Sequence, residues 1–267
     1  MNSFRYRTVF LSDLHLGTPW CKVKSLVRFL SSLECERLYL VGDIIDGWKL
    51  ARRPEWPSSH SSVIRSILSI AGRTPVTYIP GNHDEFMNQF DGRSFCGVNV
   101  CTEAVHTGAD GRKYLVTHGH EFDAVMQHGR WLAWLGDRAY EVTLRLNSGI
   151  NVLRSAAGFE EWSLAAFLKK KVKNAVKFFS RYETRIANSV RKSGAEGIIC
   201  GHIHNPSARA FQGIRYFNCG DWIDHCSILV EHNNGAMEII SEFDKMIPVP
   251  AFPVFRGERS GAAPAAD

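Results

Sequence analysis

The sequence predicts an α/β fold built around a mainly parallel β-sheet. Short apolar runs alternate with stretches of helical periodicity, and this alternation is typical of parallel βαβ units. Polar side chains follow the apolar runs, as they do where the strands of such a sheet end and functional residues gather. The length of 267 residues is enough for one domain of this class with a large insertion.

The alternation of strands and helices is clearest in the first third of the chain. Apolar residues are continuous in the expected strands and recur every three or four positions in the expected helices. We predict strands at 8–11, 38–41 and 76–79, helices at 23–33 and near 60–71, and a loop rich in Trp, Pro and Arg at 47–58. Further along, we predict strands at 113–117, 197–200, 214–218, 226–231 and 236–240, the last two joined by the turn Asn233-Asn234-Gly235.

A long segment interrupts this pattern between the fourth and fifth strands. It has apolar residues at helical spacing on one side and basic residues, among them Lys169 and Lys173, on another. The end of the chain has Pro, Gly and Ala but little to bury. We therefore predict a core formed by residues 1–121 and 196–247, a helical insertion at 122–195, and a flexible tail at 248–267.

The composition excludes a disordered or membrane-embedded protein. Of the residues, 45% are hydrophobic and 22% charged, and no apolar run approaches the roughly 20 residues that span a bilayer. The start of the chain does not read as a signal peptide, and the seven cysteines form no CxxC pair, so we expect a cytoplasmic protein with reduced thiols. The net charge is +5, but residues 124–193 hold 13 Lys and Arg against 5 Asp and Glu, and this segment would attract an anionic partner.

Residue types that bind divalent metals follow the predicted strands. Alternate residues of an extended segment point the same way, so Asp13 and His15 can bind one ion together, and the two carboxylate oxygens of Asp43 suit it to bridge two ions. We predict that one ion is bound by Asp13, His15, Asp43 and His204, and the other by Asp43, Asn82, His118 and His202. Asp, Asn and His ligands without a thiolate favour manganese, with iron or zinc as alternatives.

Paired divalent cations, about 3.5–4 Å apart, are the usual apparatus for hydrolysing phosphate esters and anhydrides. They activate a water molecule and neutralise phosphoryl oxygens, and His83 is then a candidate to stabilise the transition state or to protonate the leaving group. Single residues allow other roles: His118 alone could be a structural histidine, and Asp43 a helix cap. The occurrence of all these residues in order favours the metal site.

The motifs occur in the order found in one known family. They are Asp13-Leu14-His15, Gly42-Asp43, Gly81-Asn82-His83-Asp84, His118 and Gly201-His202-Ile203-His204. Over residues 6 to about 240 the chain resembles the calcineurin-like metallophosphoesterases. The resemblance implies a four-layer αββα sandwich, in which two sheets lie between helices, together with the metal ligands named above. It also implies that His83 lies near the scissile phosphate and that Asp84 orients it.

Within this family, the chain is most similar to the UDP-2,3-diacylglucosamine pyrophosphatases of lipid A synthesis. The similarity is carried by residues 10–17, 42–48 and 218–222. It implies that the insertion is a lipid-binding cap, that the substrate is a lipid-linked sugar nucleotide, and that the protein is peripheral on the inner face of the membrane. Members of that group commonly have Arg at the position of His83 and Asp at that of His120, so the chain resembles a related branch.

Residues outside the ligand set are candidates for contact with the substrate. They are Arg52, His120, Asp123, Lys169 and Lys173, each with the alternative of an exposed loop or a solvated helix face. The alternative function is a soluble phosphodiesterase or phosphatase acting on nucleotides or phosphoproteins. A nucleic-acid-binding module that uses the basic helices is a third hypothesis, but that segment has no sequence-reading motif, and we expect no nucleic-acid partner.

Overall fold

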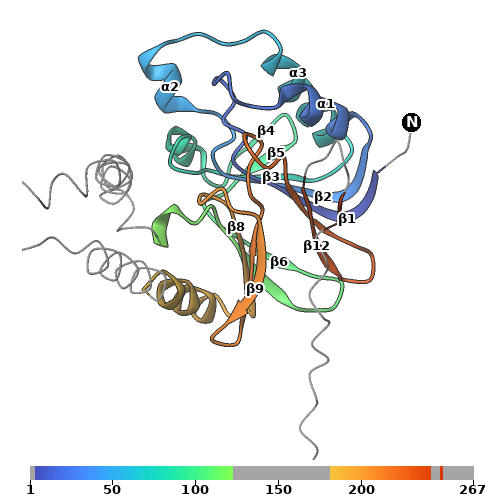
Figure 1. The fold of residues 1–267 in the computed structure, drawn as a ribbon, viewed down its shortest axis with the longest axis vertical. Coiled ribbons are helices and arrows are strands. Elements are labelled where there is room, and N and C mark those ends of the chain that lie inside the picture. The colour runs from blue at the N-terminus through green and yellow to red at the C-terminus, as the bar shows by residue number, and fades with distance from the viewer. Residues whose placement is uncertain (1–3, 123–180, 242–246, 249–267) are drawn as a thin grey trace, which may run out of the picture.

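The computed structural model describes residues 4–122, 181–241 and 247–248. These residues form two β-sheets that pack face to face, with helices on their outer faces (Figure 1). The order helix–sheet–sheet–helix is the four-layer sandwich expected from the sequence. The predicted α/β class is therefore confirmed.

The first sheet has eight strands in the order β13-β12-β11-β1-β2-β3-β5-β4. Their bounds are β1 Phe4–Leu11, β2 Leu33–Val41, β3 Val76–Ile79, β4 Ser94–Phe95, β5 Val98–Val100, β11 Ile228–Glu231, β12 Met237–Ser241 and β13 Ile247–Pro248. Strands β1, β2, β3 and β5 are parallel neighbours, whereas β4, β11, β12 and β13 pair antiparallel. The parallel part brings the carboxyl ends of β1, β2 and β3 to one edge of the sheet.

The second sheet has five strands in the order β6-β7-β8-β10-β9. Their bounds are β6 Ala104–Thr107, β7 Lys113–Val116, β8 Gly197–Cys200, β9 Ser207–Phe211 and β10 Ile214–Asn218. Strands β7, β8 and β10 are parallel, and β6 and β9 are antiparallel edge strands. A second set of parallel strand ends is thus available beside the first.

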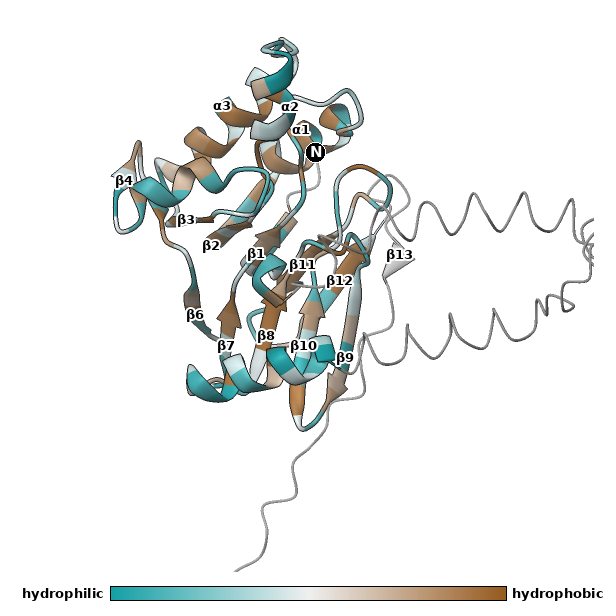
Figure 2. Cartoon of the chain, turned by 90° about the vertical axis from the view of Figure 1, so that its left-hand side faces the viewer, coloured by the Kyte–Doolittle hydropathy of each residue, from teal (hydrophilic) through white to brown (hydrophobic). Residues whose placement is uncertain are grey.

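Helices α1 (Val23–Ser31) and α3 (His60–Ala71) cover the outer face of the first sheet. Their apolar residues, such as Leu26 of α1, share one buried cluster with β1, β2 and β3. The inner faces of the two sheets share a second cluster, which includes Phe10 of β1 and Val116 of β7. In Figure 2, apolar residues colour the strands of both sheets, which lie between the two helical layers.

A helix over residues 181–192 covers the outer face of the second sheet, although it falls within the predicted insertion at 122–195. Ile186 and Val190 recur at helical spacing and are buried against β7, β8 and β10. The C-terminal end of the predicted insertion therefore packs as part of the core. Residues 123–180 lie outside the described residues, so the division into core and cap stays a prediction.

Several local elements differ from their predicted extents. The predicted loop at 47–58 begins with helix α2 (Gly47–Arg52), because the side chain of Asp46 accepts the N–H of Lys49 at 2.8 Å and caps the helix. The prediction has no counterpart for the 3-10 helices η1 (Glu85–Phe90) and η2 (His120–Phe122) or for strands β4, β5, β6, β9 and β13. These segments lack the continuous apolar run that marks the predicted strands. From residue 249 onward, the predicted tail lies outside the described residues.

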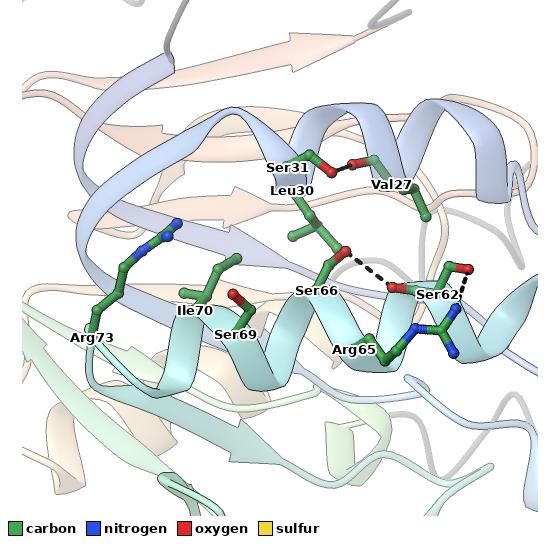
Figure 3. Close-up of a pocket in the computed structure, with 9 residues that line it drawn as sticks. All are labelled: Val27, Leu30, Ser31, Ser62, Arg65, Ser66, Ser69, Ile70 and Arg73. Atoms are coloured by element: carbon green, nitrogen blue, oxygen red, sulfur yellow. Dashed lines mark hydrogen bonds between the residues drawn. The ribbon is translucent and has the colours of Figure 1, made fainter.

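A groove of about 400 Å³ lies between α1 and α3 on the outer helical layer (Figure 3). Leu30 and Ile70 line it together with Arg65 and Arg73, and none of its lining residues belongs to the predicted site. The hydroxyl of Ser31 donates to a carbonyl of its own helix, as is usual for a helical serine.

In the described part of the chain, no helix combines the length and the apolar character needed to cross a bilayer.

A buried acid ties the two sheets together. Glu231, at the end of β11, is inaccessible to solvent, and its carboxylate accepts hydrogen bonds from Arg7 and Thr8 of β1 at 2.6 to 2.8 Å. On its other side it lies 2.9 Å from Nε2 of His106 in β6. Burial by itself raises the pKa of Glu231, but hydrogen bonds from His106, from the backbone of Ala109 and from Thr8 bring it from 4.5 down to about 2.

We expect Glu231→Gln to lower the free energy of unfolding by about 3 kcal/mol, because a buried ion pair loses one partner. The pKa is lower in the folded state, so the native carboxylate stabilises the fold fully above its unfolded value of 4.5, and this stabilisation is lost as the pH falls towards 2. Urea unfolding at neutral pH and at about pH 3 measures both effects, and the difference between the two proteins should shrink at the lower pH. Glu36→Gln is the control, because this carboxylate is 69% exposed and 3.8 Å from the same Arg7. A difference that does not depend on pH would contradict the prediction.

Candidate metal centre

Both sheets contribute side chains to one cluster beyond the carboxyl ends of their strands. The loops after β1, β2, β3, β7 and β8 carry, in that order, Asp13 with His15, Asp43, Asn82, His118, and His202 with His204. Residues far apart in the sequence meet here: the Nε2 atoms of His15 and His204, 189 positions apart in the chain, are separated by 3.2 Å. All seven predicted ligands therefore lie in loops at the same edge of the sandwich.

The backbone of this cluster is strained. Eight non-glycine residues of the described part of the chain have a positive φ, and five of them are predicted ligands: Asp13 (55°), His15 (46°), Asp43 (54°), His202 (70°) and His204 (52°). Residues other than glycine rarely adopt this left-handed region, and each instance costs on the order of 1–3 kcal/mol. A concentration of strain at residues of one chemical type indicates that their placement serves function.

Asp13, His15 and His204 form the first group of candidate ligands. One nitrogen or oxygen atom of each lies within 4.8 Å of the other two. Nε2 of His204 is 3.1 Å from Oδ1 of Asp13. The other oxygen of Asp13 accepts the backbone N–H of His202 at 3.0 Å and the hydroxyl of Ser12. The carboxylate is thereby fixed with Oδ1 turned towards the imidazoles.

Asp43, His118 and His202 form the second group, with ligand atoms again within 4.8 Å of one another. Oδ2 of Asp43 is 3.4 Å from Nε2 of His118 and 3.7 Å from Nε2 of His15, so it faces both groups. Its Oδ1 accepts the backbone N–H of His83 at 2.8 Å. Burial raises the pKa of Asp43, but the neighbouring imidazoles, first that of His118, lower it by more, and the net shift is downward. This geometry suits a carboxylate that bridges two cations.

Unpaired polar atoms test whether these residues fit metal ions. Oδ1 of Asp13, Oδ1 of Asn82 and Nε2 of His118 are buried without a hydrogen-bond partner among the described residues. An unpaired buried polar atom costs about 1–3 kcal/mol, and a bound cation removes this cost. Nδ1 of His118 lies 2.9 Å from the carbonyl oxygen of Val41, an arrangement that leaves Nε2 to a metal. The residues present therefore fit a pair of divalent cations.

The carboxylate beside His83 belongs to Asp46 and not to Asp84. Oδ2 of Asp46 lies 3.1 Å from Nδ1 of His83 and 3.2 Å from Nδ1 of His15. The ring of His83 thus turns Nε2 towards the cluster, where it lies 4.0 Å from Oδ2 of Asp43. The prediction that Asp84 orients His83 is wrong, because the side chain of Asp84 turns into the core.

Asp84 instead holds the loops after β2 and β3 together. Its carboxylate accepts the N–H groups of Asp43 at 3.2 Å and Ile44 at 2.8 Å, the N–H of Gly81, and the hydroxyl of Tyr78. Its side chain is fully buried. Asp84 is therefore a positioning residue, and contact with a substrate falls to side chains nearer the surface.

A model of the calcineurin-like phosphoesterase family matches residues 6–206, well over half of the chain. The protein belongs to the calcineurin-like phosphoesterase family. It is accordingly a metallophosphoesterase, an enzyme that hydrolyses phosphoric ester or diphosphate bonds, and the resemblance seen in the sequence is confirmed.

Individual relatives of this phosphoesterase span nearly its whole length. A UDP-2,3-diacylglucosamine hydrolase of Neisseria meningitidis serogroup B is 27% identical over 252 residues, which is 85% of this chain and 95% of the relative. A protein of the same name from Pseudomonas paraeruginosa is 24% identical over 262 residues, or 91% of this chain and 98% of the relative. Among solved structures, Yfce, a phosphoesterase from E. coli, aligns with a TM-score of 0.46 at 13% identity, covering 91% of this chain and 96% of its own.

The structure describes two of the five predicted substrate contacts of the phosphoesterase, His120 and Arg52. The ring centroid of the half-buried His120 lies 5.5 Å from that of His118 and 6.3 Å from that of His202, so His120 borders the second ligand group. Arg52 is exposed at the end of α2, and the structure gives it no contact with the cluster. The remaining three predicted contacts lie outside the described residues: Asp123, Lys169 and Lys173.

Two aromatic residues beside the cluster are absent from the predicted site. The indole of Trp48 packs on His83 with ring centroids 4.2 Å apart, and it is 45% exposed. Phe86 of η1 is equally open, and its ring approaches Gly47 next to the carbonyl of His83. Trp48 could have been found from the sequence, because it closes the segment 42–48 that carries the family resemblance. Phe86 has no comparable signal.

Gly81 lets the two ligand groups approach each other. A Cβ atom at this position would lie 2.3 Å from Oδ1 of Asp43 and 2.7 Å from Cδ2 of His118. We expect Gly81→Ala to displace both side chains, lower the metal content and reduce kcat by roughly 100-fold, as small misplacements at a catalytic centre do. Elemental analysis and steady-state kinetics measure this. Gly72→Ala, whose new Cβ would meet nothing closer than 3.6 Å, should change neither, and full activity with two metals in Gly81→Ala would contradict the prediction.

Proposed function

We propose that this phosphoesterase cleaves the diphosphate of a lipid-linked sugar nucleotide such as UDP-2,3-diacylglucosamine, using two bound divalent cations. The observation that carries the proposal is the meeting of two ligand groups at Asp43, because a phosphoryl group is best held and activated between two cations. The relatives named for that substrate cover most of this chain and nearly all of their own length, which supports the diphosphate class.

The side chains divide the work of hydrolysis. When bound, the two cations supply neutralising charge for phosphoryl oxygens and acidity for an attacking water. His83, held by Asp46, presents Nε2 at the edge of the cluster and donates a hydrogen bond to the phosphoryl or leaving oxygen. The oxygen of water ends on one phosphate and its proton on the other, so the products are UMP and a lipid phosphate.

The surface beside His83 supports a substrate with an apolar part. Trp48 and Phe86 expose aromatic rings next to it, and Trp20 exposes another on the loop after β1. Exposed aromatic rings around a polar site suit a ligand that is part apolar and part charged.

We further propose that manganese is the metal used in the cell, with iron or zinc as substitutes. We also propose that the protein works in the cytoplasm at the inner membrane surface, and that nucleic acid is not a partner.

A soluble phosphodiesterase or phosphatase acting on nucleotides or phosphoproteins is the second candidate. The residue that favours it is His83, because the lipid-specific pyrophosphatases commonly carry Arg at this position. The two candidates share the metal chemistry and differ in what binds outside it.

Reloading metal-free protein separately with Mn²⁺, Zn²⁺ or Fe²⁺ tests both candidates. We expect Mn²⁺ to restore cleavage of UDP-2,3-diacylglucosamine to UMP and lipid phosphate, with a kcat/KM at least roughly 100-fold above that for UDP-N-acetylglucosamine, which lacks the acyl chains. Equal activity on the two compounds would favour the soluble phosphodiesterase. If the loaded protein hydrolysed neither these compounds nor bis-p-nitrophenyl phosphate, the proposal would fail.

A further inference from the structure

The loop between β10 and β11 contains a histidine and a carboxylate that the predicted site does not include. The side chain of Asp221 is fully buried, and its Oδ1 accepts the N–H groups of Ile223, Asp224 and His225 at 2.8, 2.6 and 3.1 Å. Its Oδ2 is 2.6 Å from Nδ1 of His225. Four hydrogen bonds to one carboxylate fix both the loop and the ring.

This loop lies directly against the first ligand group of the metal centre. The N–H of Trp222 donates to the carbonyl oxygen of Asp13 at 3.1 Å. A Cβ atom on Gly220 would lie 3.0 Å from Pro206, two residues beyond His204. Asp221 stands between these two contacts in the chain. It therefore occupies the border of the Asp13–His204 side of the centre.

The imidazole ring of His225 is fixed on one side by Asp221 and exposed to solvent on the other. Its Nδ1 is bound to Asp221, its side chain is 44% exposed, and Nε2 has no partner among the described residues. A carboxylate that accepts from Nδ1 fixes the orientation of the ring, and the doubly protonated ring donates from Nε2–H. A charge-assisted hydrogen bond from such a donor to a phosphoryl oxygen is a strong contact.

We propose that His225 is a substrate-contacting residue that donates from Nε2 to an anionic phosphoryl oxygen at the edge of the metal centre, and that Asp221 is its positioning residue. The inference rests on the proposed function, because it assigns a contact within the same phosphate site. The contact binds substrate and makes or breaks no covalent bond. Its loss therefore weakens binding more than it slows turnover.

A similar histidine elsewhere in the chain offers a matched control. Nε2 of His232 lies 2.7 Å from Oε2 of Glu238, and its side chain is 37% exposed, yet it sits in the turn between β11 and β12. For the carboxylate, Asp224→Asn is the control, because Asp224 is exposed in the same loop. His232→Ala and Asp224→Asn change the same chemical groups outside the proposed contact.

The test uses the full chain loaded with zinc. Inorganic phosphate is the probe. We expect His225→Ala to raise KM and the inhibition constant of phosphate by roughly 10-fold or more, the loss of one charge-assisted hydrogen bond, with little change in kcat. Asp221→Asn should give a smaller effect of the same kind. His225→Gln, whose side-chain amide can donate from a similar position, should recover part of the loss. In histidine-selective ¹H–¹⁵N spectra, phosphate should shift the Nε2 resonance of His225 and leave that of His232 unchanged.

Two outcomes would overturn the inference while leaving the proposed function intact. One is an active His225→Ala protein with unchanged KM and phosphate inhibition. This result would show that Asp221 and His225 only stabilise the conformation of the loop. The other is loss of bound zinc in His225→Ala, which would make the pair a support of the metal ligands. A zinc-loaded protein without phosphoesterase activity, or one in which phosphate shifts no histidine resonance, would count against the proposed site itself.

Discussion

Replacing Asp43 by Asn should leave a folded protein with at most one bound metal ion and no more than roughly a thousandth of the original kcat/KM, a loss of about 4 kcal/mol in transition-state stabilisation. Oδ2 of Asp43 faces both ligand groups, and a neutral amide can neither bridge two cations nor balance their charge. The amide oxygen can still accept the N–H of His83, as Oδ1 of Asp43 does, so the loop should keep its shape. Elemental analysis together with steady-state kinetics measures the two effects.

Asp91→Asn is the matched control for this experiment. Asp91 also accepts a backbone N–H, that of Thr102 at 3.0 Å, but it is exposed and is not one of the candidate ligands. It should keep both metals and full activity. If Asp43→Asn also bound two metals and turned over normally, Asp43 would not be the bridging residue, and the two groups would have to act separately.

Replacing His83 by Ala should remove most turnover while both metals stay bound, with kcat reduced by roughly 10²- to 10³-fold. Nε2 of His83 lies at the edge of the cluster, 4.0 Å from Oδ2 of Asp43. In the variant, Asp46 still contacts Nδ1 of His15, so the two ligand groups should keep their positions. Because we propose that the ring acts on the transition state and not on the ions, KM should change less than kcat. Kinetics on UDP-2,3-diacylglucosamine and elemental analysis of the same preparation measure the separation.

The loss of turnover has to be distinguished from damage to the loop. His83→Gln keeps a hydrogen-bond donor and should retain more activity than His83→Ala, whereas a purely steric role would be served equally by both. Loss of both metals in His83→Ala would show that His83 is mainly structural. In that case Asp46 and Trp48, which contact its ring, would support the metal centre through it.

The α/β class followed from periodicity in the sequence, whereas the four layers were implied by the family resemblance. Strands β1, β2, β3, β7, β8 and β10 are apolar runs, and all of them except β10 are followed by predicted ligands. Their predicted C-terminal ends agree with the structure to within one residue, although β1 and β2 begin earlier than predicted. Strands β4 and β5 could not be seen in the same way, because two or three residues on the edge of a sheet carry no repeat. Helix α2 was read as a loop because its start depends on the side chain of Asp46 and not on apolar spacing.

The helix at 181–192 shows a second kind of limit. Its apolar residues continue the periodicity of the preceding predicted insertion, so the sequence offers no boundary between them. Only packing separates it: Ile186 and Val190 are buried against the second sheet, which makes the helix one of the four layers.

The sequence by itself determined which residue types follow which strands, and therefore the seven candidate ligands and the family to which their order belongs. Tertiary structure decided how the acids near them are used. Asp84 is adjacent to His83 in the chain, yet it turns inward to five backbone and hydroxyl donors, while Asp46, 37 positions away, contacts the imidazole. Asp221 and His225 lie near the other end of the chain, in a loop whose Trp222 donates its N–H to the carbonyl oxygen of Asp13. The reason is that a hydrogen bond depends on the direction of the side chain and on a donor–acceptor distance of about 3 Å. Neither can be read from how close two residues are in the sequence.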